Sequence, residues 1–133
     1  MNKKNEIESK ARAEILKSLA HPTRIFIVDL IYRNGAHCVQ ELTELVGVDT
    51  STISRHLSVL KSAGIVTDSK AGTKVYYDLA CDCIGQFMSG LQGVVAAKRS
   101  RDLELMGFPA GTAGAADTAG AAGTAELPSA GQQ

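Results

Sequence analysis

The sequence predicts a mostly α-helical winged helix-turn-helix with a small β-hairpin, whose first and last helices form a dimer. Two observations predict this fold. Two helical stretches, VQELTELVG and STISRHLSVLKSAG, are joined by the tight turn GVDT, as in a helix-turn-helix. Two β-rich runs then flank Lys70-Ala71-Gly72-Thr73, which predicts a hairpin with Lys70 and Lys74 at its tip.

The two helices that precede this motif are predicted by the spacing of their apolar residues and by proline and glycine at their ends. An apolar residue recurs every four positions from Ile7 to Leu19, which predicts a first helix with one apolar stripe. Pro22 suits the first turn of a second helix, and Gly35 suits its C-terminus. Apolar residues surround nearly all of this second helix, so we expect it to be the buried centre: Ile25, Phe26, Ile27, Val28, Leu30 and Ile31.

The second helix of the motif has two distinct faces. Asp49 or Thr50 can cap its start and Gly64 ends it. Three residues at helical spacing should face the core: Ile53, Leu57 and Leu60. The residues left outside form a polar and basic face, with no acid between residues 50 and 67: Thr52, Ser54, Arg55, Ser58 and Lys61. Such a face suits phosphates and base edges.

The last helix is expected to form the dimer. Gly85, Gly90 and Gly93 each cost about 1 kcal/mol inside a helix relative to alanine. Close approach of another helix would explain that cost, and dimerisation would add buried surface to a small domain. Its apolar residues lie at helical spacing: Ile84, Phe87, Met88, Leu91, Val94 and Val95. We expect the first helix to contribute to the same interface.

Composition divides the chain into a domain over residues 1–106 and a tail over residues 107–133. Of the 27 tail residues, 18 are Ala, Gly or Thr, which predicts disorder. No apolar run is long enough to span a bilayer, and the start MNKKNEIESK lacks the apolar core of a signal peptide. We therefore expect a cytoplasmic protein with no membrane partner, in which clustered cysteines indicate a metal or redox site before a structural disulfide.

Basic and acidic residues are equal in number over the whole chain but are distributed unevenly along it. Residues 50–76 carry four basic residues against Asp68, whereas residues 22–49 carry two basic residues and four acids. A local basic patch favours DNA as a partner. No Gly-rich phosphate loop, glycine elbow around a serine or paired carboxylates are evident, so an enzyme is not expected. A protein-interaction module without DNA remains an alternative, although it would predict acids on the recognition face.

These motifs together resemble the ArsR/SmtB family of bacterial winged-helix repressors. SLAHPTRIFIVDLI resembles the family's second helix, ELTELVGVDTSTISRHLSVLKSAGIV its helix-turn-helix, and AGTKVYYDL its wing. The likeness covers roughly residues 10 to 98. It implies a homodimer that binds a two-fold symmetric operator and leaves it when an inducer binds.

The resemblance also implies which residues contact DNA. Carried over by position, these are Ser51, Thr52, Ser54, Arg55 and His56 on the helix, with Lys70 and Lys74 in the wing. Ser58 and Lys61 join them because they share the outer face of that helix. His56 has an alternative role, half buried and hydrogen-bonded within the fold.

The resemblance makes the three cysteines candidates for the inducer site. Family members of the arsenic-sensing type carry Cys-Val-Cys where this chain has Cys38-Val39-Gln40. Residues 84–101 lack the Asp, His and Glu of a second family site. In a winged helix the strand with Cys38 pairs with the last wing strand. We therefore expect Cys38 near the end of that strand, where an extended segment would turn Cys81 and Cys83 the same way.

Three thiolates suit a soft ion, and we expect As(III) or Sb(III) held by Cys38, Cys81 and Cys83. Cd(II), Pb(II) or Zn(II), a thiol redox or persulfide signal, and three unrelated buried cysteines are the alternatives. His37 should point away from Cys38 and is a weak candidate for a fourth ligand. No permanent cofactor is expected.

Overall fold

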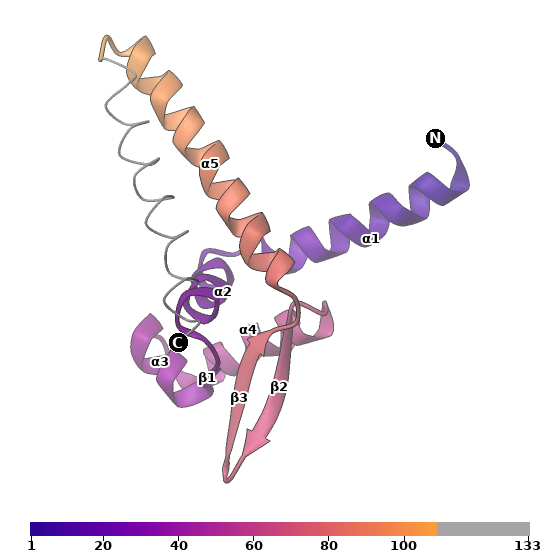
Figure 1. Ribbon diagram of the computed structural model, residues 1–133, viewed down its shortest axis with the longest axis vertical. Helices are drawn as coiled ribbons and strands as arrows, with labels where there is room; N and C mark the ends of the chain where they lie inside the picture. The colour runs from indigo at the N-terminus through magenta and orange to yellow at the C-terminus, as the bar shows by residue number, and fades with distance from the viewer. Residues whose placement is uncertain (109–133) are drawn as a thin grey trace, which may run out of the picture. The chain divides into compact units, whose positions relative to one another are not determined.

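The computed structural model describes residues 1–108 and contains five helices and three strands within that range (Figure 1). In chain order these are α1 (Lys3–Leu19), α2 (Pro22–Asn34), β1 (His37–Cys38), α3 (Val39–Val46), α4 (Thr50–Ser62), β2 (Val66–Ala71), β3 (Lys74–Leu79) and α5 (Asp82–Leu105). This order is that of a winged helix-turn-helix, so the predicted fold class is confirmed. None of the helices in this range is long and apolar enough to cross a membrane.

The chain forms two compact units, one over Met1–Gly85 and one that begins at Gln86. The first unit holds the helix-turn-helix, the sheet and the first turn of α5. In the second unit the described residues are the rest of α5 and its C-terminal end, where Gly107 has a φ of 89°. The predicted tail lies mostly in residues 109–133, outside the described residues, so its disorder and the boundary at residue 106 stay predictions.

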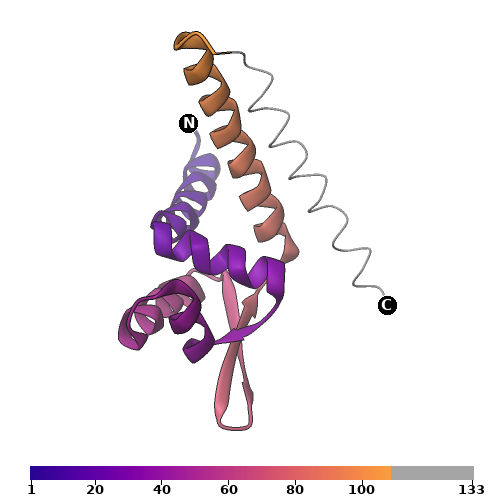
Figure 2. The ribbon, with the colours of Figure 1, turned by 90° about the vertical axis from the view of Figure 1, so that its left-hand side faces the viewer.

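The sheet is antiparallel, with strand order β1-β3-β2. β2 and β3 form a hairpin in which Ala71 pairs with Lys74, so the turn is Gly72-Thr73, shorter than the four residues predicted. Gly72 has a φ of 66°, a conformation that glycine adopts without steric cost. Within the first unit, the hairpin projects from α2, α3 and α4 in both views (Figure 1 and Figure 2). The strand pairing places Lys70 and Lys74 near its tip.

The core of the first unit is formed by α2, α3, α4 and the start of β2. All three residues predicted to face inward from α4 are fully buried: Ile53, Leu57 and Leu60. α2 buries only one side, through Ile27, Val28 and Ile31, whereas Phe26 is 45% exposed. The prediction that α2 is buried nearly all round is therefore wrong for a single protomer.

Apolar side chains remain exposed on both helices that were expected to form the dimer. On α1, Leu19 is buried, but Ile7 and Ile15 of the same predicted stripe are exposed. On α5 the exposed apolar residues include Phe87, Leu91, Val94 and Val95. Exposed apolar surface of this kind is typical of sites of protein association. A second copy of the chain is the expected partner.

Candidate nucleic-acid interface and cysteine pair

The helix-turn-helix is shaped by the residues at its helix ends. Gly47 ends α3 in the left-handed conformation, with a φ of 82°, and its N–H donates to the Thr43 carbonyl. At the start of α3, the Glu41 carboxylate accepts a hydrogen bond from the Cys38 N–H at 2.9 Å. This bond is the main cause that lowers the pKa of Glu41. These caps satisfy backbone groups that the two short helices would otherwise leave unpaired.

Asp49 caps the recognition helix α4, as one of the two predicted candidates. Its carboxylate accepts hydrogen bonds from the Thr52 N–H at 3.1 Å, from the Thr52 hydroxyl at 2.6 Å and from the Ser51 hydroxyl. These donors, the Ser51 hydroxyl first, hold the pKa of Asp49 well below its usual range. Ser51 and Thr52 thus donate toward Asp49, which leaves their oxygens free to accept, for instance from the amino groups of cytosine or adenine.

The outer face of α4 is exposed where the sequence predicts it. Ser54, Arg55 and Ser58 are exposed, and Lys70 and Lys74 are exposed in the wing. Lys61 is exposed too, but its Nζ lies 2.8 Å from the carboxylate of Asp68 on β2. In the sequence, the outer face of α4 contains no acid, because Asp68 lies after the end of this helix. In the fold it reaches that face and pairs with Lys61.

His56 is half buried and lies against His21, the N-cap residue of α2. The two ring centroids are 4.5 Å apart, and Nδ1 of His21 accepts a hydrogen bond from the Thr23 N–H. Burial is the first cause that lowers the pKa of His56, and electrostatic interactions with His21, Arg24 and Arg55 lower it further. The half-buried position agrees with the alternative role, in which the ring packs within the fold. A hydrogen bond of His56 within the fold and its contact with DNA both stay predictions.

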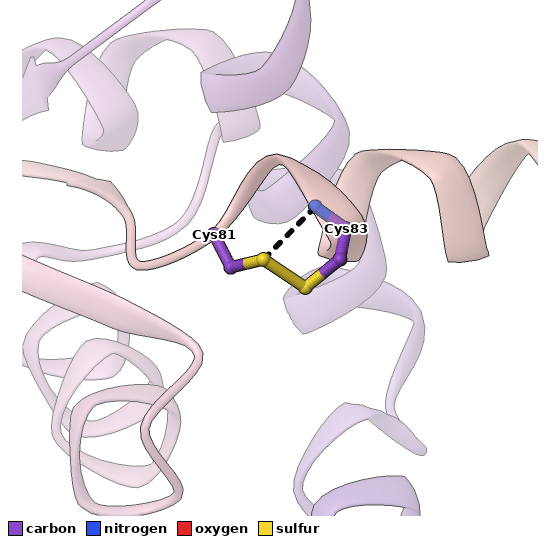
Figure 3. Close-up of a disulfide and its surroundings, with 2 residues drawn as sticks. All are labelled: Cys81 and Cys83. Carbon is purple, nitrogen blue, oxygen red and sulfur yellow. Dashed lines mark hydrogen bonds between the residues drawn. A yellow bond between two sulfur atoms is a disulfide. The ribbon is translucent and has the colours of Figure 1, made fainter.

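The two neighbouring cysteines meet at the start of α5. Cys81 and Cys83 are joined by a disulfide with their Cα atoms 5.2 Å apart (Figure 3), and both residues are exposed. The Cys83 N–H donates to Sγ of Cys81 at 3.1 Å, so this sulfur caps the helix N-terminus. Cys81 directly precedes α5 and Cys83 is its second residue. The expected convergence is present, but a turn into a helix brings it about, not an extended segment.

Cys38 lies apart from this pair. It is 3% exposed in β1 and pairs with Tyr76 in the middle of β3, five residues before Cys81. The expectation that Cys38 lies near the end of the last strand is therefore wrong, because the register of β1 on β3 differs from the one assumed. Within residues 1–108, no three His, Cys, Asp or Glu side chains are grouped so that they could hold a metal ion. The structure does not bring the three cysteines together in one protomer.

His37 is also buried, 8% exposed. The expectation that its ring points away from Cys38 stays a prediction. Its Nδ1 lies 2.6 Å from the Gly35 carbonyl oxygen, which gives the ring a partner within the fold. This contact occupies one of its two ring nitrogens. His37 as a ligand stays untested.

The sequence and the fold both match those of known proteins. Residues 21–68 match the family model described as "Bacterial regulatory protein, arsR family". The crystal structure of Mycobacterium tuberculosis Rv0081 matches with 33% identity and a TM-score of 0.67, over 71% of this chain and 95% of that chain. The chain belongs to the arsR family of bacterial regulatory proteins.

Two further likenesses describe this family member more closely. It is 44% identical over 70 residues to the HTH-type transcriptional repressor SmtB of Mycobacterium tuberculosis, covering 53% of this chain and 51% of the repressor. It thus spans about half of that relative's length. The homodimeric winged helix-turn-helix DNA-binding domain Mb0332 of Mycobacterium bovis matches with 27% identity and a TM-score of 0.65, over 71% of this chain and 87% of that one. SmtB is named a transcriptional repressor and Mb0332 a DNA-binding domain, and neither name is that of an enzyme.

Proposed function

We propose that this arsR-family protein is a homodimeric, DNA-binding transcriptional repressor released from a two-fold symmetric operator by a thiophilic inducer. The exposed hydroxyl and basic face of α4, next to a hairpin with lysines at its tip, carries the DNA part of the proposal. The recognition helix would enter the major groove and the wing would contact the backbone. The name of Mb0332 and the exposed apolar residues on α1 and α5 support the dimer.

The inducer is proposed to act at Cys81 and Cys83, and trivalent arsenic or antimony is the preferred candidate. Two sulfurs that already meet can displace two hydroxyl groups of As(OH)₃ as water, because soft ions select thiolates. The Cys81 sulfur lies at a helix N-terminus, a position that favours the thiolate once the disulfide is reduced. Cys38 is left out of this site because it pairs with Tyr76 elsewhere on the sheet. Another soft metal ion at the same pair is the closest variant of this proposal.

A redox signal is the second candidate, and the disulfide between Cys81 and Cys83 favours it. In this version the two thiols lose two electrons and two protons to an oxidant such as hydrogen peroxide, which is reduced to two waters. The product is the disulfide. Both candidates use the same two sulfurs and differ only in what joins them.

Induction would act through the spacing of the two recognition helices. They must match successive major grooves about 34–36 Å apart, so a change at the start of α5 that alters this spacing weakens binding. Allosteric coupling is typically about 1–3 kcal/mol, equivalent to about 5- to 150-fold in affinity.

Fluorescence anisotropy of the reduced protein on DNA from its own promoter tests the proposal. Release by arsenite in the absence of oxygen supports the metalloid inducer. Release by hydrogen peroxide alone, reversed by dithiothreitol, supports the redox version. If the reduced protein does not bind this DNA more tightly than unrelated DNA, the repressor proposal is wrong.

A further inference from the structure

Gly85 occupies a position that only glycine can fill without moving its neighbour. It is buried in the first turn of α5, and a Cβ at this residue would overlap the aromatic ring of Tyr32 in the last turn of α2. The Tyr32 ring therefore rests directly on the backbone of the first turn of α5. Gly90 and Gly93 in the same helix differ, because a Cβ there meets no atom within 4 Å among residues 1–108 outside the nearby backbone of α5 itself.

The turn that Tyr32 contacts is the turn that the cysteine pair closes. Cys83 and Cys81 lie two and four residues before Gly85. The Cys81 sulfur accepts the Cys83 N–H at 3.1 Å, and the Cys81 carbonyl accepts the Ile84 N–H at 3.1 Å. A change in what the sulfur binds therefore changes the capping of this turn. Arsenic between the two sulfurs would set them farther apart than a direct bond does, and would therefore move the capping sulfur relative to the Cys83 N–H.

α2 connects this turn to the recognition helix. Its buried residues Ile27, Val28 and Ile31 lie in the core with Ile53 and Leu57 of α4, and the two helices are in contact. A displacement of Tyr32 therefore reaches α4 through packed side chains. Close-packed cores transmit such strain, because they hold few voids that could absorb it.

We infer that Tyr32 and Gly85 are positioning residues, through which the chemical state of Cys81 and Cys83 acts on the helix-turn-helix. The inference rests on the proposed function in assigning the inducer to these cysteines. It adds the contact that carries the signal and predicts that inducer binding and inducer response can be separated. A role in packing alone would leave the response of any folded variant intact.

Gly85→Ala distinguishes a role in transmitting the inducer signal from a role in packing alone. Gly90→Ala is its matched control. Both variants add one methyl group to α5, but only the first meets the Tyr32 ring. We expect Gly85→Ala to bind arsenite as the natural protein does, measured by the ultraviolet absorption of the arsenic–sulfur bonds. The ratio of DNA affinities without and with arsenite should fall to below 2-fold, whereas Gly90→Ala should keep the natural ratio. Full release of Gly85→Ala by arsenite would overturn the inference.

Tyr32 gives a second test if Gly85→Ala does not fold. Its side chain is 36% exposed, so Tyr32→Ala removes a partly exposed ring, and Tyr32→Phe keeps the ring and removes the hydroxyl. The inference expects Tyr32→Phe to respond to arsenite and Tyr32→Ala to bind arsenite without releasing DNA. Equal responses of these two variants would contradict it.

A readout without DNA keeps this inference separate from the proposed function. Hydrogen exchange of the amides of residues 27–34 is compared between the disulfide and dithiol forms of each protein. Reduction should change this exchange in the natural protein and in Tyr32→Phe, but not in Tyr32→Ala. No change in the natural protein would overturn the inference, whatever the protein binds. A change there combined with no response on DNA would overturn only the proposed function.

Discussion

The Nζ atom of Lys61, in the last turn of α4, lies 2.8 Å from the carboxylate of Asp68 on β2. This pair joins the recognition helix to the wing. The hydrogen bond between the two side chains is the first cause that raises the pKa of Lys61 and lowers that of Asp68. The sequence predicts Lys61 as a DNA contact, but in the free protein its ammonium group already forms an ion pair with Asp68.

Asp68→Asn should therefore strengthen DNA binding, because it frees the Lys61 ammonium for a phosphate. We expect the slope of log affinity against log salt to steepen by about 1. Asp78→Asn is the control for charge alone, since Asp78 lies on β3 and forms no ion pair within residues 1–108. Anisotropy titrations at several salt concentrations measure both. A loss of affinity in Asp68→Asn would instead show that the pair positions the wing.

Acidification should destabilise the protein partly through Asp49. The pKa of this carboxyl is lowered in the folded state, so its contribution to stability is present above the unfolded pKa of about 3.9. That contribution is lost as the pH falls through the lower, folded pKa. Asp49→Asn keeps a capping oxygen that does not titrate in this range. Thermal unfolding between pH 6 and pH 2 should show a smaller loss of stability in Asp49→Asn than in the natural protein.

Asp29 provides a control, because its pKa is shifted in the opposite direction to that of Asp49. Burial raises the pKa of this carboxyl, although the positive charge of Arg33 partly opposes the shift. Its ionisation therefore opposes folding at neutral pH, and Asp29→Asn should remove that penalty and gain less on acidification than the natural protein does. If Asp29→Asn and Asp49→Asn changed the pH dependence in the same direction, the assignment of these shifts would be wrong.

Replacing each cysteine should divide the three into two classes. Cys38→Ser should keep the response to arsenite or peroxide, because Cys38 lies apart from the pair and serine is itself a good N-cap residue. Cys81→Ser and Cys83→Ser should bind DNA but lose the response, because each removes one of the two sulfurs that meet. Anisotropy with and without inducer measures this. Loss of the response in Cys38→Ser would restore the three-cysteine site predicted from the sequence.

A charge on the exposed apolar face of α5 should disrupt the dimer. Val94 is 63% exposed in the single chain, so Val94→Asp costs little within a protomer but places a carboxylate in the proposed interface. We expect sedimentation to show a monomer with helical content retained, and DNA affinity to fall because one protomer reads one half-site. Gln92→Glu adds a charge to an exposed polar position of the same helix and should remain a dimer.

The pattern within α4 could be predicted from the sequence, whereas contacts between elements could not. The spacing of Ile53, Leu57 and Leu60 predicts the buried face of α4, because helical period alone determines it. The register of β1 on β3 could not be predicted, because a strand of two residues carries no alternating pattern to fix it. The position of Cys38 depended on that register.

Contacts between side chains of different elements could not be predicted from the sequence either. Asp68 follows Lys61 by seven residues and lies in a strand, so no helical rule relates the two. Gly85 appeared to be one of three similar glycines in α5, and only the fold shows that one of them touches Tyr32. The Cys81–Cys83 pair was found because both cysteines lie within three residues.

The exposed position of Cys81 and Cys83 has an evolutionary consequence. Neither residue belongs to the buried core: Cys81 lies in the short connection after the wing, and Cys83 lies in the first turn of α5. Substitutions there can change which chemical the protein detects while the residues that select its genomic targets stay the same. A lineage could therefore acquire a new stimulus for an existing set of genes through very few codon changes, provided that the glycine after this connection is kept.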